Sequence, residues 1–168
     1  FQFLRVGRVG GAWMLAGALI ILMVQIPVLG AWLPSALASV AGWILDVPGM
    51  ATLRDVLVYM DTVTKPIVAA IAGPTMGGGL ELALGAHYRC AITGAQIALP
   101  EVKLGLVPGA TGTQRLPRLV GMTVALDIIT SGRQVSADEA LKLGITDRIA
   151  AGDLREEAVT LARSLVGK

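Results

Sequence analysis

The stretch that decides the fold runs from Gly73 to Gly109, beginning Gly-Pro-Thr-Met-Gly-Gly-Gly-Leu-Glu and ending Leu-Pro-Glu-Val-Lys-Leu-Gly-Leu-Val-Pro-Gly. It contains two acidic residues, Glu81 and Glu101. Both have apolar neighbours, where an ionised carboxylate is costly to desolvate and its proton affinity rises. Two such carboxylates are what general acid/base chemistry needs.

Glycines 77 to 79 form a run between a predicted strand and a predicted helix. Successive glycines in that position let a ligand approach the backbone and leave N–H groups pointing outward at the start of the helix. The run matches neither a Walker loop nor a dinucleotide fingerprint. The carboxylate of Glu81, two residues further on, would also repel a phosphate. We therefore expect these donors to hold an oxyanion that develops from a neutral carbonyl.

Residues 47–168 have the pattern of an alternating α/β domain. Some segments repeat apolar residues at helical spacing, whereas short runs rich in Ile, Val and Ala predict buried strands. Ser136 followed by Glu139 is a capping-box signature, and Gly144 is the expected end of the short helix that it opens. The other predicted helices cover 52–62, 80–84, 111–120, 124–130 and 153 to the end of the chain, and the predicted strands cover 67–72, 87–92, 95–99 and 145–149.

Composition narrows the classes of function. The 168 residues are 54% hydrophobic and 15% charged, with a net charge of +2, which is too small and too scattered a charge to predict a nucleic-acid partner. Cys90 is the only cysteine and His87 the only histidine, so the sequence predicts no disulfide framework and no metal site. A reducing, cytoplasm-like compartment fits this usage best.

The first 46 residues differ from the rest. No charged residue occurs from Val9 to Leu45, and the apolar run 12–29 is long enough for a membrane span. Arg5 and Arg8 before it would suit a signal anchor, whereas Gln25 and Pro27 interrupt the run near its end. The alternatives are a membrane-associated segment and a buried or poorly folding apolar segment.

Residues 47–168 resemble the enoyl-CoA hydratase/isomerase (crotonase) family, and most closely the hydratase part of bifunctional hydratase/3-hydroxyacyl-CoA dehydrogenases. The resemblance implies a crotonase-like (ClpP/crotonase) α/β fold, a spiral of ββα units, here expected to be incomplete at both ends. The ordered motifs that carry it are Lys65-Pro-Ile-Val-Ala-Ala-Ile71, Gly77-Gly-Gly-Leu-Glu-Leu-Ala83, Leu99-Pro-Glu-Val-Lys-Leu-Gly105, Pro108-Gly-Ala-Thr-Gly-Thr-Gln-Arg-Leu116, Ser131-Gly-Arg133 and Ala137-Asp-Glu-Ala140.

The same resemblance implies roles for four residues. Glu81 and Glu101 would hold a water that adds across a 2-enoyl thioester, one acting as base and the other supplying a proton. Gly78 would donate its N–H to the thioester oxygen, and Gly109 would position the water through its N–H. The implied activity is enoyl-CoA hydration in fatty-acid β-oxidation, with coenzyme A as part of the substrate and no further cofactor. Isomerases of the family generally lack the full glutamate pair, so a Δ3-Δ2-enoyl-CoA isomerase, or another acyl-CoA enzyme of the fold, is the alternative rather than the first expectation.

Other residues stay open at this level. His87 and Cys90 are predicted to lie in a strand with no chemical role. Lys103, Arg115 and Arg118 are either ligands of the CoA phosphates or exposed solubilising charges. Family members suggest a homo-oligomer or a fused dehydrogenase domain, although no nicotinamide-binding fingerprint occurs here. The expected location is the cytoplasm for a bacterial protein and the peroxisome for a eukaryotic one.

The chain departs from the family before the Lys-Pro strand. Crotonases carry an Ala-Gly-Ala-Asp-type segment there, which supplies the second oxyanion donor, and residues 1–46 contain no such motif. One hypothesis is that these residues are an out-of-frame translation of a GC-rich hydratase gene, since the codons of residues 34–38 can spell Phe-Cys-Ala-Gly in another frame. An inactive, membrane-associated remnant is the third alternative for function.

Overall fold

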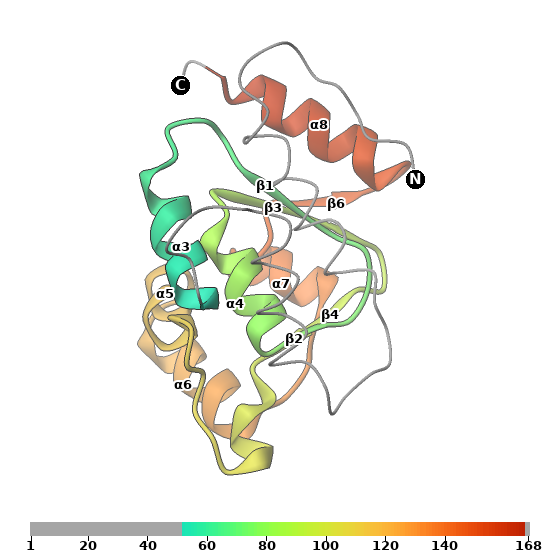
Figure 1. Ribbon diagram of the computed structural model, residues 1–168. Helices are drawn as coiled ribbons and strands as arrows, with labels where there is room; N and C mark the ends of the chain where they lie inside the picture. The colour runs from blue at the N-terminus through green and yellow to red at the C-terminus, as the bar shows by residue number, and fades with distance from the viewer. Residues whose placement is uncertain (1–51, 167–168) are drawn as a thin grey trace.

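The computed structural model describes residues 52–166, which form two three-stranded sheets with helices packed around them (Figure 1). One sheet has the order β1-β3-β6, and all of its strands are parallel. The other has the order β2-β4-β5, in which β2 is parallel and β5 antiparallel to β4. The strands are β1 (Val68–Ile71), β2 (Thr75–Met76), β3 (Tyr88–Ile92), β4 (Gln96–Ala98), β5 (Val135–Ser136) and β6 (Arg148–Ala150).

The chain passes from the first sheet to the second twice. Gly73 and Pro74 separate β1 from β2, and a turn containing Gly94, whose φ is +84°, separates β3 from β4. A helix follows each such pair of strands, so the chain repeats a ββα unit. The expected crotonase-like α/β fold is confirmed in the part of the chain that the structure describes. The helices are α3 (Leu53–Thr62), α4 (Gly78–Gly85), the 3₁₀ helix η1 (Pro100–Leu104), α5 (Gly112–Val120), α6 (Met122–Ser131), α7 (Ala137–Leu143) and α8 (Leu154–Ser164).

Side-chain caps fix where several helices begin. Thr52 forms a reciprocal capping box with Asp55 at the start of α3. The Ser136 and Asp153 side chains accept the backbone N–H groups three residues on, at α7 and α8 respectively. These caps satisfy N–H groups that lack an intrahelical acceptor. The predicted starts at residues 52, 136 and 153 are therefore confirmed as cap positions.

The structure differs from the predicted elements most at two boundaries and in two short strands. The last strand begins at Arg148 rather than at residue 145, because the Ile145 and Thr146 N–H groups bond to the Ala140 carbonyl and close the end of α7. The terminal helix ends at Ser164 and not at the end of the chain. The two-residue strands β2 and β5 were not predicted, because they are too short for an alternating pattern to show.

The strand pattern divides the core into two clusters. Ala69 and Ile71 of β1 face the larger cluster with α3 and α4, whereas Ala70 between them faces α8 together with Cys90. Figure 1 shows α8 lying over β1, β3 and β6, with α4 on the other side of these strands. This sandwich holds α4, which carries Glu81, against the sheet.

Two segments interpreted from the sequence fall outside the described residues. Both the segment 1–46 and the apolar run 12–29 precede residue 52. Within residues 52–166, no helix combines the length and apolarity needed to cross a membrane.

Candidate active site

The start of α4 is built on the glycine run. Gly77 has φ +55° and ψ −127°, a conformation that favours glycine, and its N–H donates to the Ala98 carbonyl at 2.9 Å. This bond ties the helix start to β4. Gly78 is the first residue of α4, so its N–H has no acceptor within the helix. That N–H is therefore available to a ligand, as the oxyanion prediction requires. The predicted role of Gly78 in binding the thioester oxygen stays a prediction.

Glu81 lies in the first turn of α4 and is 3% exposed. Its Oε1 accepts two backbone N–H groups, from Ala110 and from Gly112, each at 2.7 Å. Bonds this short are typical of a carboxylate oxygen that accepts from backbone N–H groups. The arrangement therefore holds the Glu81 side chain in a fixed position inside the protein.

The loop before α5 is shaped for this carboxylate. Thr111 has φ +80°, the only positive φ of a non-glycine residue among the described residues. The left-handed turn directs the N–H groups on either side of it toward one oxygen, an anion-binding backbone arrangement. Arg115 Nε donates to the Thr111 hydroxyl at 2.8 Å and supports the turn.

Gly112 leaves the space that Glu81 fills. A Cβ at this position would lie 2.9 Å from Glu81 Oε1, 3.0 Å from Glu81 Cγ and 3.1 Å from Pro108 Cβ. The positioning role of Ala110 and Gly112 was not predicted from the sequence. The available signal was the glycine and threonine content of the segment after Pro108, which is unusual for the start of a helix.

Glu101 occupies a different environment in η1. Its Oε2 is buried and has no hydrogen-bond partner within residues 52–166. Burial raises the pKa of Glu101, the nearby charge of Glu81 raises this pKa further, and the Glu101 backbone N–H partly offsets both effects. Its Oε1 would be 3.1 Å from a Cβ on Gly77, which places this carboxyl at the start of α4. Both predicted acidic residues therefore lie around one helix terminus.

The other residues singled out from the sequence form no hydrogen bond with Glu81 or Glu101 within residues 52–166. Gly109 is exposed in the turn before Ala110, and its proposed bond to water stays a prediction. His87 is exposed just before β3, and its Nδ1 accepts the Ile67 N–H at 3.1 Å. Cys90 is buried in β3, and this burial raises the pKa of its thiol. Lys103 is exposed in η1.

A buried ion pair was also missed from the sequence. Arg89 is 3% exposed, and its guanidinium bonds to the Ala86 and Ile145 carbonyls and to Asp147 at 3.2 Å. Desolvation lowers the pKa of Arg89, while Asp147 opposes this shift. The pair joins β3 to the segment before β6 and has a structural role.

Comparison with known protein families matches residues 50–168 to the family described as Enoyl-CoA hydratase/isomerase. The chain belongs to this family. The expected resemblance is therefore confirmed, and the match begins close to the predicted boundary at residue 47.

The names of individual similar proteins agree with this family assignment. The human peroxisomal bifunctional enzyme is 59% identical over 112 residues, covering 67% of this chain and 16% of that protein. A probable enoyl-CoA hydratase from Bacillus subtilis is 48% identical over 109 residues, covering 65% of this chain and 42% of that protein. The crystal structure of an enoyl-CoA hydratase from Bacillus anthracis aligns with a TM-score of 0.66 and 37% identity, covering 69% of this chain and 45% of that one. The chain thus spans less than half the length of these relatives.

Proposed function

We propose that this chain carries the hydratase function of its family: the addition of water to a 2-enoyl-CoA to give a 3-hydroxyacyl-CoA. The observation that carries the proposal is the contrast between two carboxyls at the start of α4. Glu81 accepts two backbone N–H groups, whereas Glu101 is buried with a raised pKa and has an oxygen without a hydrogen-bond partner within residues 52–166. Glu81 is therefore suited to act as the base and Glu101 as the acid. Hydration needs one carboxyl in each of these roles.

This contrast is the basis on which we propose which carboxyl takes a proton and which gives one. Glu81 takes a proton from water as the water oxygen bonds to C3 of the enoyl group. Glu101 gives its proton to C2, and the negative charge that develops meanwhile on the thioester oxygen is stabilised by the Gly78 N–H. Each turnover leaves Glu81 protonated and Glu101 ionised, and proton exchange with solvent restores the starting state. Water supplies the oxygen and both protons overall, so we propose no cofactor beyond the CoA of the substrate.

Names of relatives support a place in fatty-acid oxidation. The relatives include peroxisomal bifunctional enzymes and the fatty acid oxidation complex subunit alpha of Shewanella baltica, which is 49% identical over 112 residues. We extend to this chain an acyl-CoA substrate and a role in β-oxidation. Its compartment is then the peroxisome in a eukaryote and the cytoplasm in a bacterium. A fused dehydrogenase domain or a homo-oligomer is the assembly that the family suggests.

A direct test offers the chain two substrates separately. With 2-enoyl-CoA, hydration removes the conjugated thioester absorbance; with 3-enoyl-CoA, isomerisation creates it. The proposal predicts loss of absorbance with the first substrate and a much slower gain with the second. A gain from 3-enoyl-CoA without loss from 2-enoyl-CoA would replace hydration by isomerisation, which requires only one carboxylate to move a proton.

A further inference from the structure

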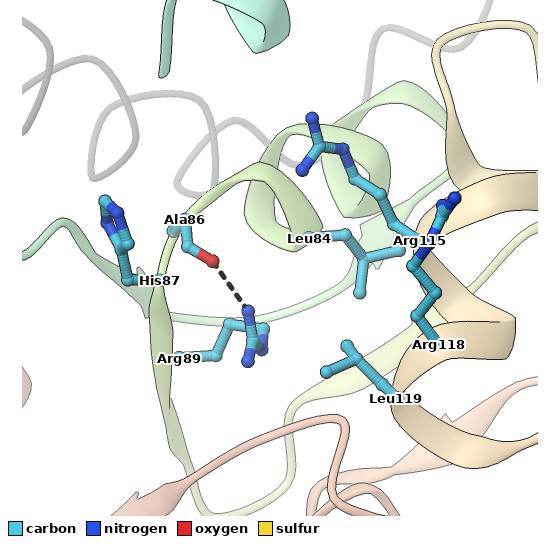
Figure 2. Close-up of a pocket in the computed structure, with 7 residues that line it drawn as sticks. All are labelled: Leu84, Ala86, His87, Arg89, Arg115, Arg118 and Leu119. Atoms are coloured by element: carbon cyan, nitrogen blue, oxygen red, sulfur yellow. Dashed lines mark hydrogen bonds between the residues drawn. The ribbon is translucent and has the colours of Figure 1, made fainter. Parts of the chain in front are cut away.

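The C-terminal end of α4 borders a small cavity, whereas Glu81 lies in the first turn of that helix (Figure 2). The cavity has a volume of about 190 Å³. Its apolar lining comes from Leu84, Ala86 and Leu119, and its polar lining comes from His87 and three arginines. Figure 2 shows His87 and the α5 arginines approaching from opposite sides, with Arg89 between them.

Two of the three arginines already have carboxylate partners. Arg89 donates to backbone carbonyls, including that of Ala86, and pairs with Asp147. Arg115 pairs with Asp61 at 2.7 Å and also supports the loop that binds Glu81. These two guanidinium groups therefore serve the fold, and their partners offset their charges.

Arg118 and His87 have spare donors. Arg118 Nη1 donates to the Gln114 carbonyl of its own helix, and among residues 52–166 no carboxylate lies within ion-pair distance of it. The His87 Nδ1 accepts the Ile67 N–H, so the neutral imidazole carries its proton on Nε2. Since Asp61 and Asp147 balance two of the three guanidinium groups, the cavity retains a net positive charge.

The volume of the cavity and the chemistry of its lining indicate which kind of ligand it suits. Whole cofactors and drug-sized ligands occupy pockets of roughly 300–1,000 Å³, so this cavity suits a compact group. An arginine with free N–H groups beside an imidazole donor and an apolar floor favours a tetrahedral oxyanion over a neutral ligand. We propose that this cavity is a binding site for a phosphate group, either as free inorganic phosphate or as the phosphate of a larger ligand.

The test measures phosphate binding to the full chain by isothermal titration calorimetry at constant ionic strength. Inorganic phosphate is one probe, and adenosine 3′,5′-bisphosphate is the other. Arg118→Gln removes the unpaired charge. His87→Asn keeps an acceptor near the position of Nδ1 and removes the Nε2 donor. Arg163→Gln, which removes an exposed guanidinium from α8, is the matched control.

The proposal predicts saturable binding of at least one probe, with affinity reduced about tenfold or more by Arg118→Gln and by His87→Asn, and unchanged by Arg163→Gln. Equal affinity for both probes would identify a free-anion site, and preference for the bisphosphate would identify part of a larger ligand. Failure of both probes to saturate the chain would overturn the proposal. So would binding that all three substitutions weaken equally, since that would reflect general attraction to a basic surface.

Discussion

Replacing Gly112 by alanine tests the positioning of Glu81 without touching an ionisable group. The added Cβ would lie 2.9 Å from Glu81 Oε1, whereas ordinary contacts begin at 3.4 Å, so the oxygen must move by about 0.5 Å. That shift would stretch its 2.7 Å hydrogen bonds to about 3.2 Å, the long limit of the N–H···O range. The carboxylate would lose much of the contact that holds it in position.

The size of the effect follows from the hydrogen bonds. Each bond to a charged group contributes about 1.5–3 kcal/mol, so loss of one at the transition state lowers kcat/KM by about 10- to 150-fold. We expect the loss in kcat rather than in KM, because the proposed mechanism has Glu81 contact the water and not the CoA. Hydration of a short 2-enoyl-CoA, followed by absorbance, measures both constants.

Gly73→Ala is the matched control. A Cβ at Gly73 would meet no atom of residues 52–166 within 4 Å, and its φ is not in the left-handed region. Circular dichroism melting curves establish that both variants are folded. A folded Gly112→Ala chain with the kcat of the unmodified chain would refute the argument that these backbone donors position Glu81.

Three further predictions concern stability. Gly85→Ala would place a Cβ against Leu57 and overpack the core, which lowers the free energy of unfolding by about 1–3 kcal/mol in urea titrations; an unchanged midpoint would contradict this. Asp147→Ala leaves Arg89 buried without its carboxylate and should cost about 1–3 kcal/mol, whereas Asp147→Asn, which keeps an acceptor oxygen, should cost less; equal losses would show that the acceptor is unimportant. Burial raises the pKa of Glu101 above its ordinary 4.5, so the folded chain binds this proton more tightly than the unfolded chain and stability falls as pH rises through the folded pKa. Glu101→Gln should therefore stabilise the chain at neutral pH and have little effect below pH 4.5, and destabilisation at neutral pH would contradict the assignment.

Local signals in the sequence predicted much of this fold. Helix starts at Thr52, Ser136 and Asp153 were predictable because each cap depends on residues within three positions. The strand 67–72 was predictable from its apolar run. Glu81 and Glu101 stood out because they are isolated carboxyls in apolar sequence, and the structure brings both to the start of α4.

Contacts between distant segments were not predictable in this way. The bonds from Ala110 and Gly112 to Glu81 join residues about 30 positions apart, and their geometry depends on the left-handed turn at Thr111. In the sequence, Arg89 is a charged residue within a predicted strand, and nothing next to it indicates that it is buried. Its burial depends on Asp147, which lies 58 positions further on. Pairing over such separations is set by the packing of the sheets, which residue spacing does not encode.

The most direct measurement of the central claim is hydration of a short 2-enoyl-CoA in ¹⁸O-labelled water, with the product analysed by mass spectrometry. We expect a 3-hydroxyacyl-CoA that carries one solvent oxygen, formed by the unmodified chain and by neither Glu81→Gln nor Glu101→Gln. Labelled product formed at the unmodified rate by either variant, in a folded chain, would contradict the claim that these two carboxyls act as base and acid.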